Sequence, residues 1–400
     1  MKAFVASVAA YFTDPKYPSL GLAIVFLKII GLWKLKKVHY IVPFCLFITF
    51  MSQILYMLFS PRIVHFFLNL FQTGFFHLGL IKMALYFYNL PTWMETFNWL
   101  SEMELQQLED EHLKPIVDKF TKYGNRVTWG WLIASYATWV FNYGENLLMV
   151  IYQIETLHEI DPTYITFYLL WPTEPATGRW NVYPYIVVQF LYSFFTVTYL
   201  NLFDVLCVST MIAMAGQIEV LSEMFRRALD TDSEEEQYRN LITCYKRYAD
   251  ILFTQKKLNS VMSPVLFMYL LIASINMSFI LFSLANLQKS SKIASQVLVL
   301  ALMIEAFYYY WHGHQVRYQS ENISAAVYDS DWVDKSPEIR RLVYIMSSTV
   351  NRKLVYNAGP FNEVTVVTFI QVFMLTNSVG LIGLSSGKTP ASSLISDVYA

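Results

Sequence analysis

Charged side chains are scarce in this sequence. Only 15% of its 400 residues are Asp, Glu, Lys or Arg, whereas 55% are hydrophobic and 17% are aromatic. The formal net charge is −1, so the composition indicates neither a nucleic acid nor a strongly acidic partner. It favours one helical bundle in lipid over the two or three soluble domains that the length alone would suggest.

Cysteine and catalytic motifs are also scarce. Cys45 and Cys207 fall in apolar stretches and Cys244 in a basic loop, so we expect no extracellular disulfide framework. The sequence has no Gly-rich phosphate loop, no nucleophile elbow and no pair of cysteines at redox spacing. His312 and His314 lie close together, but no further residue is spaced to complete a metal site. We therefore expect neither an enzyme nor a bound metal or cofactor.

Long apolar stretches are what the sequence has in abundance. Seven of them approach or exceed the roughly 20 residues that a helix needs to cross a bilayer. They lie at Val38–Phe59, Val64–Tyr88, Val127–Ile151, Tyr183–Met214, Val261–Ala285, Ile293–Trp311 and Phe361–Leu384. This pattern predicts an all-α membrane protein with seven transmembrane helices. The segment before the first stretch has no cleavable signal peptide.

The basic residues predict the orientation of these helices. The N-terminal segment and the loops after the second, fourth and sixth stretches hold 23 Lys and Arg, whereas the other loops and the C-terminal tail hold 5. The positive-inside rule then places the N-terminus in the cytosol and the C-terminus outside the cell. This orientation is opposite to that of a G-protein-coupled receptor. A transporter is disfavoured because no paired halves with broken helices are visible.

The predicted spans divide the chain into segments. Residues 217–260 and Pro337–Leu354 are amphipathic, so we expect cytosolic helices that form an assembly domain shared between subunits, with a turn between 230 and 236. The segments are a cytosolic N-terminal segment (1–37), helices 1–4 (38–216) with an aromatic extracellular lid loop (152–182), a cytosolic helical extension (217–260), helices 5–6 (261–313), a cytosolic anchor region (314–358), the last helix (359–384) and an extracellular tail (385–400).

Ionisable residues inside or beside the spans raise separate expectations. Asp204 and Glu305 are isolated in sequence, so each is expected to face protein or water, as a structural group or as a residue for gating or ligand contact. Lys82 lies near the inner end of the second span and is expected to reach the headgroups. The loop 91–126, with acidic residues such as Glu104, is expected to form a solvated helix.

The outer halves of the second to sixth spans are rich in aromatic, Met and small polar residues. This is the composition of a pocket for a small apolar molecule, in which a few hydroxyl or amide groups orient the guest. Ordinary helix packing would also explain any single one of these residues. The candidate ligand-binding residues are Phe75, His77, Ser135, Tyr136, Thr138, Trp139, Asn142, Tyr185, Gln189, Tyr192 and Met277.

The last span carries small polar and apolar residues roughly along one helical stripe. Such a stripe either lines a narrow aqueous path around a symmetry axis, with Val379 or a neighbour as an apolar constriction, or packs helices together. The candidate pore and gate residues are Thr368, Val372, Thr376, Val379, Gly380 and Gly383.

The C-terminal third resembles the insect odorant receptor family. The most specific match is Tyr328-Asp329-Ser330-Asp331-Trp332, and a glycine, Gly313, closes the sixth span as in that family. Further matches are Ser320, Glu321, Ala325, the start of the last span at Phe361, Asn362 and Thr365, and Gly31-Leu32-Trp33 before the first span. The related gustatory receptors space a Thr and a Gln one residue further apart than Thr365 and Gln371.

The resemblance implies a function. Members are subunits of ligand-gated, non-selective cation channels in the plasma membrane of sensory neurons, and most form heterotetramers with the shared odorant receptor co-receptor. A small volatile apolar ligand would bind in the outer half of the bundle, and the last helices would surround the pore. Gly313, Tyr328 and Trp332 would serve assembly. The alternatives are a gustatory-type channel of the same superfamily and, with less support, a G-protein-coupled receptor.

Overall fold

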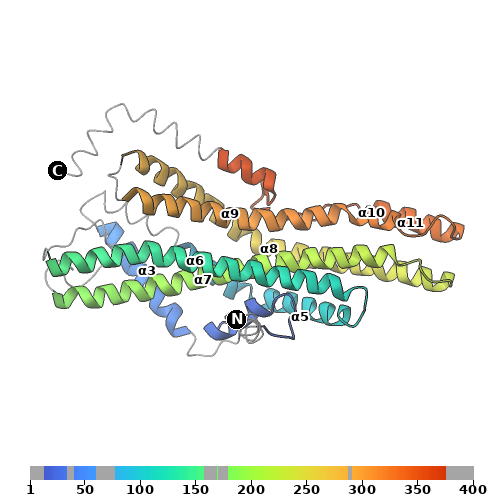
Figure 1. The fold of residues 1–400 in the computed structure, drawn as a ribbon, viewed down its shortest axis with the longest axis horizontal. Helices are drawn as coiled ribbons and strands as arrows, with labels where there is room; N and C mark the ends of the chain where they lie inside the picture. The colour runs from blue at the N-terminus through green and yellow to red at the C-terminus, as the bar shows by residue number, and fades with distance from the viewer. Residues whose placement is uncertain are drawn as a thin grey trace, which may run out of the picture.

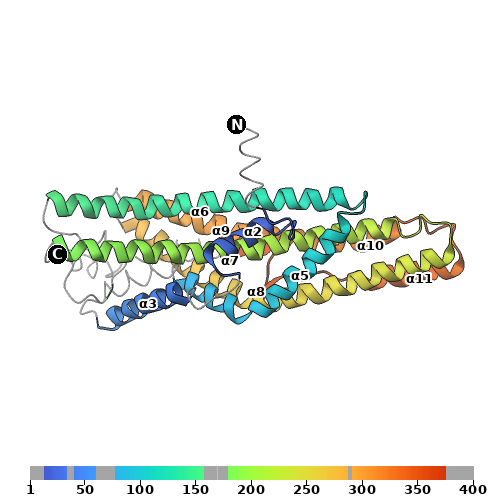
Figure 2. The ribbon, with the colours of Figure 1, turned by 90° about the horizontal axis from the view of Figure 1, so that it is seen from below.

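The structure, a computed structural model, describes residues 13–33, 40–59, 77–156, 169, 179–286 and 291–374. It is an elongated helical bundle in which α6 to α9 run along the long axis (Figures 1 and 2). The elements are α2 (Gly21–Ile30), α3 (Ile41–Phe59), α5 (Leu90–Gln107), α6 (Lys114–Thr156), α7 (Arg179–Arg226), α8 (Glu234–Asn286), α9 (Ser291–Glu321), α10 (Ile323–Tyr328), α11 (Pro337–Thr349), β1 (Asn357–Ala358) and β2 (Asn362–Glu363). Residues 77–88 and 366–374 are also helical.

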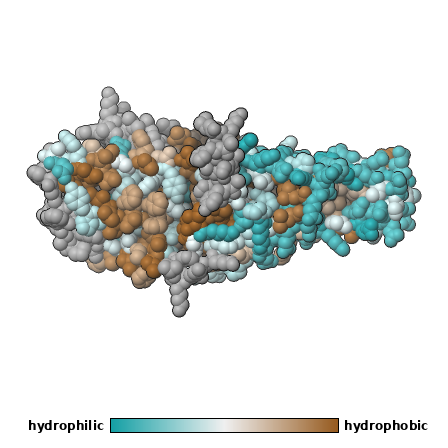
Figure 3. All heavy atoms as spheres, turned by 60° about the horizontal axis from the view of Figure 1, so that its bottom comes forward, coloured by the Kyte–Doolittle hydropathy of each residue, from teal (hydrophilic) through white to brown (hydrophobic). Residues whose placement is uncertain are grey.

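The bundle is divided lengthwise into two halves. Figure 3 shows a broad hydrophobic half and a narrow hydrophilic half, which we call the apolar half and the polar half. Among the described residues, three helices are long and apolar enough to cross a membrane: α3, Tyr183–Arg226 of α7 and Glu234–Ser278 of α8. The third and sixth predicted spans lie in α6 and α9. The second and last spans are described only over 77–88 and 361–374, and the last is helical from residue 366.

Helices α7 and α8 are too long for the membrane alone. The 48 residues of α7 extend about 72 Å at about 1.5 Å per residue, more than twice the roughly 30 Å of hydrocarbon. Both helices therefore continue into the polar half, where α10 and α11 pack beside them (Figure 1). Between the end of α7 at Arg226 and the start of α8 at Glu234 lies the turn that the sequence predicts.

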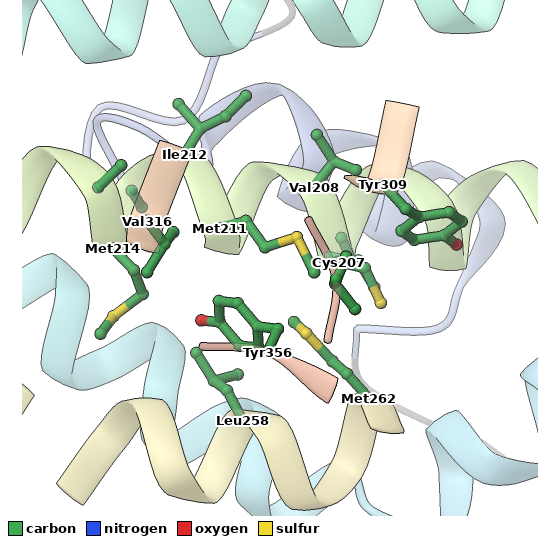
Figure 4. Packing of buried hydrophobic residues seen from close by; sticks show 14 of the residues in the cluster. Cys207, Val208, Met211, Ile212, Met214, Leu258, Met262, Tyr309, Val316 and Tyr356 are labelled. Carbon is green, nitrogen blue, oxygen red and sulfur yellow. The ribbon is translucent and has the colours of Figure 1, made fainter. Parts of the chain in front are cut away.

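Helix α7 forms the centre of the molecule. Nearly all of its side chains are buried between Tyr199 and Leu221, as expected of a helix that is apolar on every face. Figure 4 shows Cys207 and Met211 of α7 packed with Met262 of α8 around the ring of Tyr356. This layer lies where the apolar and polar halves meet.

Residues 350–365, which we call the strap, thread from α11 through this layer to the last helix. Polar side chains one turn apart on α8 bond backbone groups that lie two residues apart on the strap. The pairs are Gln255 Nε2 with the Val355 carbonyl at 2.8 Å, Asn259 Oδ1 with the Asn357 N–H at 2.7 Å, and Ser263 Oγ with the Gly359 N–H at 3.0 Å. The spacings match because one helical turn and two extended residues both advance about 6 Å.

Helix α5 corrects the expectation of a solvated helix over 91–126. Trp93, Phe97 and Leu100 are fully buried against the core. Glu104 is only 3% exposed and accepts hydrogen bonds from the backbone N–H and the hydroxyl of Ser19, at 3.0 and 2.5 Å. The prediction was wrong because the N-terminal segment packs on this helix, which a count of acidic residues does not reveal.

The amphipathic run before the last span is a helix, as predicted. Ser336 caps the N-terminus of α11 by accepting a hydrogen bond from the Ile339 N–H at 3.4 Å. Ile339, Val343 and Met346 recur at helical spacing and are buried against α8 and α10. The opposite face of α11 is exposed in the single chain.

Candidate ligand and pore sites

Helices α6 and α7 bring several predicted ligand-binding residues together. Ser135 Oγ donates to Asn201 Oδ1 at 2.5 Å, and Tyr136 Oη lies 2.9 Å from Thr198 Oγ1. The Thr138 hydroxyl instead donates to the carbonyl of residue 134 in its own helix. The polar groups of Ser135 and Tyr136 therefore face α7 and link the two helices at the level of the apolar half.

Trp139 lies at the centre of an aromatic cluster between α6 and α7. Its Nε1 donates to Ser193 Oγ at 3.3 Å, and its ring stacks on Tyr143 with centroids 5.9 Å apart. Phe190 and Phe194 of α7 lie 5.5 and 5.6 Å from the same ring. Such a wall of rings with an indole N–H already bonded inside it is suited to contact with an apolar guest.

The remaining described candidates lie on other helices. His77 Nε2 lies 2.9 Å from Gln53 Oε1, and its ring packs edge-on against Phe50 of α3. Tyr185, Gln189 and Tyr192 follow one face of α7, and Met277 lies on α8; all four are buried. Phe75 lies outside the described residues, as does the side chain of Asn142.

The aromatic loop 152–182 is described at one internal residue, Leu169. This residue is buried at 5% exposure, and its backbone N–H donates to Tyr185 Oη at 3.3 Å. At this point the loop packs onto α7 beside the predicted ligand-binding residues. The lid function itself stays a prediction.

An ion triad in the apolar half was missed by sequence reasoning. Lys82 Nζ lies 2.5 Å from Asp204 Oδ1 and 3.1 Å from Glu305 Oε1, and all three side chains are at most 2% exposed. The hydroxyl of Tyr309 also donates to Asp204. The expectation that Lys82 reaches the headgroups was wrong, and the two carboxylates are not isolated, because they share one cation.

Close packing of the 77–88 helix on α7 makes the triad possible. A Cβ on Gly79 would lie 2.6 Å from the Thr196 carbonyl oxygen, so only glycine permits this approach of the two backbones. The Lys82 ammonium also lies 5.0 and 5.6 Å from the ring centroids of Tyr269 and Tyr309. One lysine thus joins four helices. The sequence does contain a signal for the triad, because three of the apolar spans carry one lysine and two carboxylates whose charges can pair.

The last helix is described for its first part only. Phe369 packs against Phe307 and Tyr310 of α9, with ring centroids 5.7 and 6.0 Å apart. Thr368 and Val372, from the predicted pore stripe, are half-buried at the edge of this contact. The other pore and gate candidates, Thr376, Val379, Gly380 and Gly383, lie outside the described residues.

The predicted assembly residues occupy two different settings. Gly313 is in an intrachain contact, since a Cβ there would lie 2.7 Å from Val364 of the strap. Tyr328 is 49% exposed and packs edge-on against Trp332, whose Nε1 donates to the Tyr328 carbonyl at 3.1 Å. Their role in assembly stays a prediction. Over the part of the chain that the structure describes, no group of three or more His, Cys, Asp or Glu side chains is placed to hold a metal ion.

Comparison with known protein families identifies the family of this chain. Residues 62–376 match the family model of seven-transmembrane odorant receptors. The chain belongs to the odorant receptor family. This is not an enzyme family, and it is chosen over the gustatory-type alternative.

Individual relatives of the receptor are distant in sequence. It is 28% identical to odorant receptor 2a of Drosophila melanogaster over 150 residues, which cover 36% of this chain and 38% of that one. It is 22% identical to odorant receptor 10 of Aedes albopictus over 40% of this chain and 44% of that one. The matched regions thus span less than half the length of these relatives.

The fold is shared over a much larger part of the chain. The insect olfactory receptor OR5 from Machilis hrabei superimposes with a TM-score of 0.78, covering 90% of this chain and 96% of that one at 16% identity. Its complex with eugenol superimposes with a TM-score of 0.72 at 14% identity, covering 91% and 97%. The receptor is accordingly a seven-helix, all-α membrane protein.

Proposed function

We propose that the receptor is a subunit of a ligand-gated, non-selective cation channel that a small volatile apolar molecule opens. One observation carries the proposal: the fold covers 96% of an olfactory receptor chain whose structure is also known in complex with eugenol. In this proposal the receptor lies in the plasma membrane of a sensory neuron, with a cytosolic N-terminus, and forms a heterotetramer with odorant receptor co-receptor subunits.

The proposed pocket lies in the apolar half beside the aromatic cluster of α6 and α7. Trp139 and Tyr136 supply apolar ring surface, and burial of a guest there contributes about 25 cal/mol per Å² of apolar area. Ser135 and Tyr136 already have partners on α7. A ligand hydroxyl or carbonyl would compete for these groups, so the hydroxyls would select among guests of similar size.

The proposed gate is an apolar constriction at Val379 on the last helix. A ligand opens such a gate only if it binds the open arrangement better than the closed one. The contact of Phe369 with Phe307 and Tyr310 supports α9 as the connection, because it joins the bundle to the start of the last helix. An apolar ring of this kind conducts when it widens enough to hold water.

Whole-cell recording tests this function. Cells that express the receptor with and without the co-receptor would be exposed to small esters, alcohols, aldehydes and terpenes. We expect rapid cation current in co-expressing cells only, which persists with G proteins blocked. Current that requires a G protein would contradict the channel mechanism, and current without the co-receptor would contradict the heteromer.

A pair of variants tests the pocket with the same recording. Trp139→Ala removes the centre of the aromatic cluster, so we expect the half-maximal ligand concentration to rise at least about tenfold, equivalent to about 1.4 kcal/mol. Val140→Ala is the matched control because Val140, at 59% exposure, points away from the cluster. Equal responses of the two variants would place the ligand elsewhere.

A further inference from the structure

A cavity of about 530 Å³ lies between α6, α7 and α9, outside the proposed odorant pocket. Its floor is apolar, with Phe120, Ile212 and Ala215, and its rim carries Lys122 and Arg126 of α6. Both cations are exposed and one helical turn apart, a spacing that allows their side chains to contact one anion. The cavity therefore combines an apolar interior with a positive rim.

The charge of this rim is not neutralised by any carboxylate that the structure describes. Lys119, which also lines the cavity, is paired with Glu219 at 2.7 Å. Within the described ranges, neither Lys122 nor Arg126 has a carboxylate at ion-pair distance. Two unpaired cations one helical turn apart favour a phosphate-bearing anion as their partner.

The position of the cavity identifies the kind of anion. Arg126 directly precedes the third predicted span, and Trp311 on the opposite wall ends the sixth. The cavity therefore lies at the membrane boundary on the side that the basic loops mark as cytosolic, where anionic lipids are concentrated. Trp311 is 38% exposed there, a setting that interfacial tryptophans favour.

An apolar track leads from the cavity towards the membrane interior. On α6, Gly130 lies one turn beyond Arg126, and no atom lies within 4 Å of where its Cβ would be. Ile133 follows at 64% exposure. On α9, Ile304 lies two turns from Trp311 on the same face and is 46% exposed. An acyl chain that extends from the cavity would cover these residues, whereas a soluble anion would leave them uncovered.

We propose that this cavity binds an anionic phospholipid of the cytosolic leaflet, with the phosphate at Lys122 and Arg126 and an acyl chain along Gly130 and Ile133. The headgroup neutralises the two unpaired cations, and the acyl chain covers the apolar floor and track. The site is separate from the odorant pocket, so its test does not depend on channel opening.

Binding to purified receptor in detergent tests the proposal. Fluorescently labelled phosphatidylserine would be titrated into the full-length receptor, with phosphatidylcholine, unlabelled phosphatidylserine and soluble glycerophosphoserine as competitors. We expect phosphatidylserine to compete at least about tenfold better than either other compound. Equal competition by phosphatidylcholine would overturn the role of the charge, and equal competition by glycerophosphoserine would show a site for soluble phosphates instead.

A double variant locates the binding. Each basic residue near an anionic surface contributes about 1 kcal/mol, so Lys122→Gln/Arg126→Gln should weaken phosphatidylserine binding about 30-fold. The control Lys246→Gln/Arg340→Gln removes two exposed cations from α8 and α11, and we expect less than a twofold change. All four positions are exposed, so the variants should fold. Equal weakening in both would reduce the effect to overall charge and overturn the site.

Discussion

Lys82 holds together residues that would otherwise repel one another inside the bundle. Asp204 and Glu305 approach the same ammonium group, and Tyr309 donates a further hydrogen bond to Asp204. Removal of water from a charge costs several kcal/mol, and only partners of this quality offset that cost. At the scale of single residues, the triad is therefore more informative about structure than any surface ion pair.

The triad predicts a large loss of stability when its cation is removed. Lys82→Met leaves two buried carboxylates without a counter-ion, so we expect the unfolding free energy to fall by about 3–5 kcal/mol. Thermal unfolding of the purified receptor in detergent measures this. The triple variant Lys82→Met/Asp204→Asn/Glu305→Gln removes the charges together and should recover most of the loss.

Lys257→Met is the matched control for the triad. It breaks the partly exposed pair of Lys257 with Glu95, which should cost less than about 1 kcal/mol because solvent screens exposed charges. Equal unfolding midpoints for Lys82→Met and Lys257→Met would contradict the structural role of the triad.

Glu104 predicts a pH dependence at a second residue. Burial raises the pKa of its carboxyl from 4.5 to about 7, against the opposing effect of the hydrogen bonds from Ser19. A raised pKa means that the folded state binds the proton more tightly than the unfolded state between these two values. The stabilisation is complete below about pH 4.5 and is lost as the pH rises to about 7.

The measurement compares wild type with Glu104→Gln between pH 5 and pH 8. We expect the wild type to lose on the order of 3 kcal/mol relative to the variant over this range. Glu102→Gln is the control, because Glu102 is exposed on the same helix and should leave the pH profile unchanged. Parallel profiles for wild type and Glu104→Gln would contradict the shifted pKa.

At the scale of secondary-structure elements, the strap joins α8 to the last helix. Its backbone is bonded by Gln255, Asn259 and Ser263, and Tyr356 fills the core between α7 and α8 (Figure 4). These hydrogen bonds fix α8 to the residues directly before the last helix. The hairpin of β1 and β2 completes the strap, and Gly359 follows β1 with a φ of 71°.

Gly359 gives a prediction for this element. Alanine at a left-handed backbone position costs about 1–2 kcal/mol, and its Cβ would also lie 2.6 Å from Phe267. We expect Gly359→Ala to lower the unfolding midpoint and the channel current together. Gly144→Ala is the matched control because Gly144 lies inside α6 with open space around it, so alanine there should stabilise by about 0.5–1 kcal/mol. A current unchanged by Gly359→Ala would separate the strap from gating.

At the scale of the whole molecule, the receptor has one apolar half and one polar half that extends well beyond the membrane (Figure 3). The polar half contains α10, α11 and the ends of α7 and α8. Most of the 23 basic residues of the N-terminal segment and of the loops after the second, fourth and sixth spans belong to it. The positive-inside rule therefore predicts that the polar half lies in the cytosol.

Epitope tags test this orientation. We expect a tag before residue 1 to be stained only after the cells are permeabilised, and a tag after residue 400 to be stained in intact cells. A tag inserted between α7 and α8, in the exposed turn near Asp232, should behave like the N-terminal one. Staining of the N-terminal tag in intact cells would reverse the assignment of the two halves.

Sequence alone determined the seven-helix, all-α class of the receptor, whereas the orientation that its basic residues indicate stays a prediction. Period and length of the apolar stretches are local properties, and the positive-inside count is a sum over loops, so neither depends on how helices pack. The same holds for α11, whose cap and apolar positions lie within 13 residues. The pocket for an apolar guest that the aromatic residues of α6 and α7 suggest stays a prediction.

Only the tertiary structure decided which polar groups meet. Lys82 pairs with Asp204 and Glu305 across 122 and 223 residues of sequence, and Glu104 bonds Ser19 across 85. Such pairs depend on the rotation and axial register of whole helices, which hydrophobic periodicity leaves open because many rotations bury the same apolar stripe. The strap required the structure for the same reason: its backbone finds partners on α8 only when both elements are in place.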